Sequence, residues 1–349
     1  MQRVARRVVG KARRTARWAS SRPAPRAAVL MYHAVGEVDV DPWGLFVSPS
    51  NFAAHVEVLA RRARPLRLDQ LPTAAAPDGE PTRRGVVVTF DDGYANNLLV
   101  ARPLLARHGV PATVFVVSTQ LDRGGELWWD ELAAMVLQPG DLPPRLELVI
   151  DDVVVVRDLG AAVAYPPDEW RADHTWRDGD PAPSARMSLY LQLWQRLWTV
   201  DDASRRRALR ELGRWAGVQS EPRETHRTLT IAELGSLSAD GLVTIGSHTE
   251  THPLLTSLPH DSIRRELVSS RARLESVLEN PIRSFSYPFG AHDDGVVAAV
   301  AGSGYDTAVT GRPHTTGVAV DPLRIGRFDV RNWDGDEFER RLVRWLRYH

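Results

Sequence analysis

Short β-branched runs that alternate with stretches of helical spacing constrain the fold of this chain more than any other feature. Residues 85–90 and 112–117 are two such runs, and residues 98–109 between them carry leucines at helical spacing before a glycine. A strand, a helix and a second strand joined by short connections form a βαβ unit with parallel strands. The alternation returns after residue 228, with strands expected at 242–245, 283–287 and 306–310. A parallel α/β fold is therefore predicted.

Residues 122–227 interrupt this alternation and hold seven of the eleven tryptophans of the 349-residue chain. Two aliphatic runs flanking Asp151-Asp152 predict a hairpin, and leucines at helical spacing predict two helices around 191–198 and 206–215. We therefore expect a barrel formed by residues 27–121 and 228–349, with the Trp-rich segment inserted into it.

The first 26 residues carry nine basic residues and no acidic one, although the whole chain has 44 Lys+Arg and 44 Asp+Glu. Two interpretations stay open for this segment. It is either a flexible, solvated basic arm or a surface helix that contacts anionic lipid, since small apolar residues recur every fourth position from Val4 to Ala16. Nucleic-acid binding is not expected, because the cations are confined to the arm and the remainder is acidic.

We expect neither a cleavable signal peptide nor a transmembrane helix in this sequence. Arginines interrupt the segment where a signal peptide would have its apolar stretch. No run approaches the ~18 apolar residues that a membrane-spanning helix needs. We expect the protein in the cytoplasm or peripherally at the inner membrane face, and the sequence leaves its oligomeric state open.

Three polar motifs stand at the carboxyl ends of predicted strands, the edge where parallel sheets and barrels carry their active sites. They are Thr89-Phe90-Asp91-Asp92-Gly93-Tyr94, Ser247-His248-Thr249-Glu250-Thr251-His252-Pro253 and Ser286-Tyr287-Pro288-Phe289-Gly290. Taken alone, each motif can be explained without a function. Asp-Asp-Gly can be a simple turn, and the two histidines can be a chance pair on the surface. Gly246 and Pro253 argue against a continuous helix through the histidines. The order of all three motifs after strands favours one shared site.

The residue types in these motifs suit a catalytic metal site. The chain contains no cysteine, so any metal must be held by His, Asp or Glu. Two histidines separated by three residues can reach one ion, and imidazole with carboxylate suits Zn²⁺ or a similar divalent ion. Such a ligand set leaves coordination positions open for water and substrate. A turn after the strand would let one of the adjacent aspartates bind metal while the other takes a proton.

Through the Thr-Phe-Asp-Asp-Gly and Ser-His-Thr-x-x-His-Pro motifs, the chain resembles the polysaccharide deacetylase (NodB-homology) family of carbohydrate esterases over roughly residues 28–120 and 228–330. The resemblance implies a distorted (β/α) barrel of about seven strands, here with a helical and hairpin insertion. It also implies metal-dependent hydrolysis of acetamido groups on an acetylated glycan. Its implied site comprises the general base Asp91 and one divalent ion, expected to be Zn²⁺, on Asp92, His248 and His252.

The same resemblance implies a groove wall made by Tyr287, Pro288 and Phe289, with the Tyr287 backbone N–H facing the developing oxyanion. Trp128 and Trp129 follow a Gly-Gly loop just past a strand end, so they are candidates for stacking on a sugar ring. Packing is the ordinary role of such tryptophans and remains the alternative for both.

The sequence departs from the family pattern at two places. Family members often carry an arginine before the Pro-Tyr motif that orients the base, whereas this chain reads Phe285-Ser286-Tyr287. Arg324 or Arg327, from a neighbouring strand, is the candidate replacement. The second departure is a late Leu-x-His motif, normally the source of the general acid, which is missing after residue 290.

A histidine near the start of the chain offers a substitute for that acid. The run Leu30-Met31-Tyr32-His33 reads as a strand ending in His33, which resembles a rearranged branch of the family with the acid-bearing strand first. The first and last strands of a closed barrel are neighbours, so moving this strand between termini preserves the site. A purely structural histidine is the alternative for His33. For the whole chain, the alternatives are an inactive carbohydrate-binding relative and an O-acetyl esterase acting on a glycan.

Overall fold

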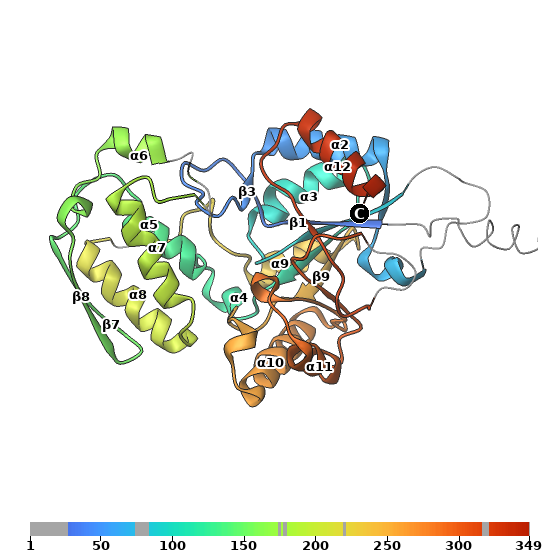
Figure 1. Cartoon of the computed structure of the whole chain (residues 1–349). Coiled ribbons are helices and arrows are strands. Elements are labelled where there is room, and N and C mark those ends of the chain that lie inside the picture. Colours follow the sequence, from blue (N-terminus) through green and yellow to red (C-terminus); the bar gives the residue numbers. More distant parts are fainter. Residues whose placement is uncertain are drawn as a thin grey trace, which may run out of the picture.

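The centre of the molecule is a parallel sheet that curls through 243° into a half-barrel (Figure 1). The structure, a computed structural model, describes residues 27–73, 84–173, 176, 180–218, 221–315 and 321–348, so the basic arm lies outside the described residues. Seven strands follow one another in the order β11-β10-β9-β6-β5-β1-β12, and β4 pairs with β5 beside them. Their bounds are β1 Ala27–Tyr32, β4 Arg64–Leu66, β5 Gly85–Phe90, β6 Ala112–Val116, β9 Val243–Ser247, β10 Ser284–Ser286, β11 Thr307–Val309 and β12 Phe328–Asp329.

This architecture confirms the predicted distorted barrel of about seven strands. The strand predicted at 85–90 has the bounds of β5, and β6 ends one residue before the predicted run does. The strand predicted at 242–245 continues to Ser247, so Gly246 lies within β9 rather than in the turn after it. The strand β12 has no recognisable pattern in the sequence, because two residues are too few to show a period.

Residues on the strands alternate between the barrel interior and the helical layer outside it. On β5, Val86, Val88 and Phe90 pack into the outer hydrophobic core, whereas Val87 belongs to a small cluster inside the barrel. Thr89 and the next residue in that phase, Asp91, therefore also point inward. The same alternation carries Ser286, at the end of β10, into the interior.

Helices cover the outer face of the barrel, with α2, α3 and α12 together on one side and α10 and α11 on the other (Figure 1). Local sequence signals start several of them. The Ser48 side chain caps α2, and Thr230 and Glu233 form a capping box at the start of α9. The bounds are α2 Pro49–Arg62, α3 Arg102–Arg107, α9 Ile231–Ser238, α10 His260–Leu278, α11 Asp294–Gly302 and α12 Gly335–Tyr348.

Most elements between residues 122 and 227 form a second hydrophobic core beside the barrel (Figure 1). The elements that form it are α5 Trp128–Val136, the antiparallel pair β7 Arg145–Ile150 and β8 Val153–Asp158, α7 Ala185–Leu197 and α8 Asp202–Ala216. The short α4 Gln120–Arg123 joins the barrel core through Leu121, and α6 Pro167–Asp173 lies between β8 and α7 along the chain. Phe46 and Tyr94 from the barrel side join the second core, so it packs directly against the region of the predicted site. Among the described residues, none of the helices has the length and apolar character that a membrane span requires.

Gly246 tests how tightly the barrel interior is packed near the site. A Cβ atom there would lie 2.4 Å from Cδ1 of the fully buried Phe115, whereas a Cβ on the helical Gly235 would meet nothing within 4 Å. We expect Gly246→Ala to lower the free energy of unfolding by about 1–3 kcal/mol through overpacking. Gly235→Ala should raise it by roughly 0.5–1 kcal/mol, because alanine favours helix over glycine. Urea denaturation checks both, and effects of the same sign would contradict this account of the interior.

Candidate active site and metal centre

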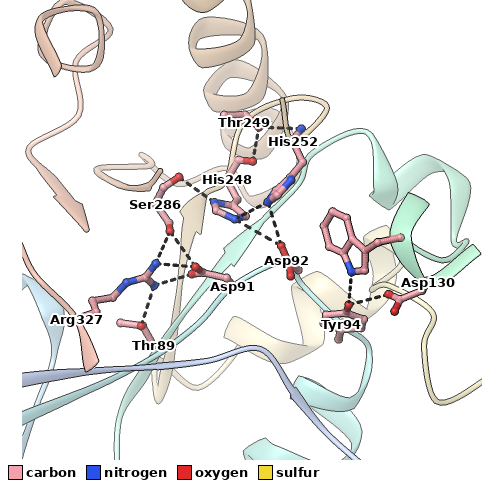
Figure 2. Close-up of polar contacts among 11 residues, drawn as sticks. Thr89, Asp91, Asp92, Tyr94, Asp130, His248, Thr249, His252, Ser286 and Arg327 are labelled. Atoms are coloured by element: carbon pink, nitrogen blue, oxygen red, sulfur yellow. Dashed lines mark hydrogen bonds and ion pairs between the residues drawn. The ribbon is translucent and has the colours of Figure 1, made fainter. Parts of the chain in front are cut away.

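Asp91 follows β5 inside the barrel and is fully engaged by a buried arginine (Figure 2). Arg327 Nη1 donates to Asp91 Oδ1 at 2.7 Å, and Nη2 donates to Oδ2 at 2.6 Å. The Ser286 hydroxyl donates to Oδ2 at 3.1 Å, and Thr89 Oγ1 accepts a hydrogen bond from Arg327. A two-pronged arginine contact of this kind fixes the orientation of a carboxylate as well as its charge.

The protonation state of Asp91 follows from these partners. Burial by itself raises the pKa of the carboxyl, but the charges of Arg327, His248 and His33 outweigh that effect and hold the pKa below its ordinary value. Asp91 is therefore ionised and accepts hydrogen bonds across the neutral pH range.

Asp92 points away from Asp91 because the chain turns sharply between them. Its backbone has φ 72°, a left-handed conformation uncommon for a residue other than glycine, and Gly93 follows with φ 73°. The turn directs the Asp92 carboxylate toward two histidines, with Oδ1 at 3.5 Å from His248 Nε2 and 3.4 Å from His252 Nε2. The two Nε2 atoms are 3.1 Å apart, and all three side chains are buried.

These three residues can hold one divalent ion. One ligand atom from each lies within 4.8 Å of the others, and among the described residues theirs is the only such group of three or more His, Cys, Asp or Glu side chains. Burial and the nearby His248 lower the pKa of His252 to about 3, so its ring is neutral, the form that binds metal. Two imidazole nitrogens and one carboxylate oxygen that converge on one point form a donor set suited to Zn²⁺ and related ions.

His33 follows β1 directly and lies beside the aspartate pair. The register of β1 and β5 places Tyr32 opposite Phe90, and the Asp91 N–H donates to the Tyr32 carbonyl at 3.0 Å. The half-buried His33 ring acts electrostatically on both Asp91 and Asp92. The structure thus places the candidate acid next to the candidate base, and its role stays a prediction.

The expectation that the Tyr287 N–H faces an oxyanion is wrong, because this N–H donates to the Val309 carbonyl at 3.2 Å. The Tyr287 side chain is also fully buried, with its hydroxyl on the Leu323 carbonyl at 2.9 Å, and Pro288 is buried beside it. Phe289 alone of this motif presents an open surface, being 40% exposed. The centroid of its ring lies 4.6 Å from that of the His252 ring.

Trp128 and Trp129 belong to the second core rather than to an open sugar platform, since only 6% and 5% of their surfaces are exposed. Trp129 packs against His252 with ring centroids 4.9 Å apart, and its Nε1 donates to the Tyr94 hydroxyl at 3.2 Å. Figure 2 shows the Tyr94 hydroxyl in turn donating to Asp130, at 2.7 Å. The stacking prediction is therefore corrected, because both rings are covered by the protein.

Helix α7 completes the surroundings of the exposed Phe289. The centroid of Trp198, just past its end, lies 5.5 Å from that of Phe289, and Trp194 lies 6.5 Å from it. Leucine and tryptophan spacing predicted this helix but gave no signal that one end of it would reach the site. The Trp-rich segment thus contributes one side of the space next to the metal ligands.

Of the two candidate arginines, only Arg327 reaches Asp91. Arg324 is half-exposed and pairs with the exposed Asp294 at 2.5 Å. The sequence could not separate the two, because β12, which begins directly after Arg327, has no detectable pattern.

Comparison with known proteins adds to this geometry. The sequence model described as polysaccharide deacetylase matches residues 78–141 and 213–308, which contain Asp91, Asp92, both metal-site histidines and the Tyr287 motif. Over these segments the chain is similar to the polysaccharide deacetylase family, as the sequence motifs predicted. The predicted resemblance to this family is thereby confirmed. Both His33 and Arg327 lie outside the matched segments.

Individual relatives agree with this match. A Bacillus subtilis protein, YxkH, named as a polysaccharide deacetylase, is 26% identical over 122 residues, which are 35% of this chain and 42% of that protein. The fold is similar to that of the Streptococcus pyogenes deacetylase PplD, with TM-score 0.56, 15% identity and coverage of 93% and 99% of the two chains. It is also similar to IcaB from Ammonifex degensii, with TM-score 0.55, 16% identity and coverage of 93% and 98%.

The buried Arg327–Asp91 pair gives a stability prediction. We expect Arg327→Met to lower the free energy of unfolding by about 3–5 kcal/mol, because it leaves the Asp91 charge buried without its partner. The control Arg324→Met breaks a solvent-screened pair and should leave the urea midpoint nearly unchanged. Similar midpoints for the two variants would contradict the assignment of Arg327 as the partner of Asp91.

Proposed function

We propose that this protein is a metal-dependent hydrolase that removes N-acetyl groups from amino sugars of a polysaccharide or glycan, giving a free amine and acetate. The observation that carries the proposal is that two adjacent carboxylates have different partners. Asp91 is held by Arg327, and Asp92 faces His248 and His252. A hydrolase of this kind needs one carboxylate for the proton and another for the metal.

Asp92, His248 and His252 would hold the ion, with Zn²⁺ as the expected metal. When bound, a divalent ion supplies Lewis acidity toward the acetyl carbonyl and toward water. We call these three residues the metal triad. The remaining steps of the reaction depend on the side chains around it.

Asp91 would take a proton from the attacking water while the water oxygen bonds to the acetyl carbon. Its lowered pKa makes this carboxylate a weak base. Its contribution to the rate would come from its fixed orientation, which Arg327 and Ser286 hold. His33 would then donate a proton to the sugar nitrogen as the carbon–nitrogen bond breaks. In the tight turn after β10, the Phe289 N–H has no hydrogen-bond partner among the described residues, which makes it the better candidate for stabilising the oxyanion.

The exposed ring of Phe289 beside His252 would form the wall against which a sugar ring packs. An aromatic face next to the reacting group suits the apolar face of a pyranose ring. This supports a glycan substrate, in keeping with the family that the chain resembles.

Substitutions at the two aspartates separate metal binding from turnover. Asp92→Ala should abolish both Zn²⁺ binding and acetate release from N-acetylated chito-oligosaccharides. Asp91→Asn should keep Zn²⁺ and lose at least 10²-fold in kcat, the usual contribution of a positioned proton acceptor. Full activity in Asp91→Asn would refute its assignment as base, and wild-type activity resistant to a chelator would refute metal dependence. Absence of all activity would favour an inactive carbohydrate-binding relative. Acetate release only from O-acetylated glycan would favour an esterase.

His33 can be tested with the same assay. We expect His33→Gln to lower kcat by roughly 10²–10⁴-fold while Zn²⁺ affinity stays unchanged, because the residue would donate a proton without binding the ion. His108→Gln, on an exposed histidine after α3, serves as the matched control and should behave as wild type. Unaltered kcat in His33→Gln would assign this histidine a structural role.

A further inference from the structure

The two histidines of the triad are held in different ways. His248 continues β9, with its N–H on the Val116 carbonyl at 2.9 Å, and its ring Nδ1 bonds to the Ser286 carbonyl at 2.8 Å. By contrast, His252 Nδ1 is buried and has no hydrogen-bond partner among the described residues. Aromatic rings pack on the His252 ring, but no hydrogen bond sets its orientation away from the triad. The position of His252 therefore depends on its backbone.

That backbone is strained. Thr249 has φ 70° and His252 has φ 59°, so two residues other than glycine adopt the left-handed conformation within one short loop. Each such residue costs on the order of 1 kcal/mol and persists only where surrounding contacts enforce it. Within the loop, the His252 N–H donates to Thr249 Oγ1 at 2.9 Å, which closes the turn but does not attach it to the rest of the fold.

Glu266 on α10 attaches this loop from one side. Its Oε2 accepts the backbone N–H groups of Glu250 and Thr251, both at 2.9 Å, and its Oε1 accepts the Thr251 hydroxyl at 2.6 Å. One carboxyl group thus binds three donors of the loop. On the opposite side, the N–H groups of Ser118 and Thr119 donate to the Thr249 and Glu250 carbonyls, both at 3.1 Å.

We propose that Glu266 is a positioning residue for the metal ligand His252. It holds the Thr249–His252 loop in its left-handed geometry, so that His252 Nε2 stays 3.4 Å from Asp92 Oδ1 and 3.1 Å from His248 Nε2. This inference rests on the proposed metal site. The His252 ring lacks a hydrogen bond that would orient it, and the contacts of Glu266 with the loop backbone take over that role. Residues behind the ligands of a metal commonly provide such support.

Zn²⁺ titration by calorimetry on metal-stripped protein tests the proposal. Glu266→Met keeps the side-chain length but loses all three acceptor contacts, and we expect it to weaken Zn²⁺ binding by roughly 10–100-fold. Glu266→Gln keeps one acceptor oxygen and should show a smaller loss. The matched control is Glu275→Met on the same helix, whose carboxylate bonds to Arg271 and to the Ile282 N–H rather than to the loop. It should bind Zn²⁺ with wild-type affinity.

Hydrogen exchange supplies a readout that needs no metal. The Glu250 and Thr251 amides should be protected in wild type and in Glu275→Met, and should exchange faster in Glu266→Met. Wild-type Zn²⁺ affinity in a folded Glu266→Met variant would overturn the proposal. If that variant does not fold, unchanged affinity and amide protection in Glu266→Gln would overturn it instead. A wild-type protein that binds no Zn²⁺ would overturn the metal site on which the inference depends, whereas acetate release decides the proposed function separately.

Discussion

The buried ion pair between Arg327 and Asp91 is the interaction on which the arrangement of the site depends. An unpaired carboxylate in the barrel interior would be costly, so the arginine and the Ser286 hydroxyl together make Asp91 tolerable there. While Arg327 binds Asp91, the left-handed turn at Asp92 directs the Asp92 carboxylate toward the histidines. Two chemically identical neighbours thereby acquire different environments, the condition under which one carboxylate can bind metal and the other can accept a proton.

The parallel sheet makes this division possible, because it brings the ends of β1, β5, β9 and β10 to one edge of the barrel. The segment between residues 122 and 227 then encloses that edge with aromatic rings. Trp129 packs on His252, and Trp198 packs on Phe289, whose ring also contacts His252. Such apolar surroundings strengthen the electrostatic interactions among the ligands.

The sequence was sufficient for the strands with continuous β-branched runs, such as residues 85–90, and for the motifs that bring Asp92, His248 and His252 together. It was not sufficient where tertiary contacts decide. Arg327 could not be told from Arg324, because the two-residue β12 carries no pattern. The Tyr287 N–H was misassigned because its acceptor, Val309, comes from a strand distant in sequence. Glu266 gave no signal, since a glutamate on an amphipathic helix ordinarily faces solvent.

The central claim is that the adjacent aspartates have separate partners, and anomalous diffraction at the zinc edge from crystals grown with Zn²⁺ tests it most directly. The account predicts one strong peak bound by Asp92, His248 and His252, with Asp91 still on Arg327. A peak bound by the Asp91 carboxylate, or an ion held elsewhere while the triad stays empty, would contradict it.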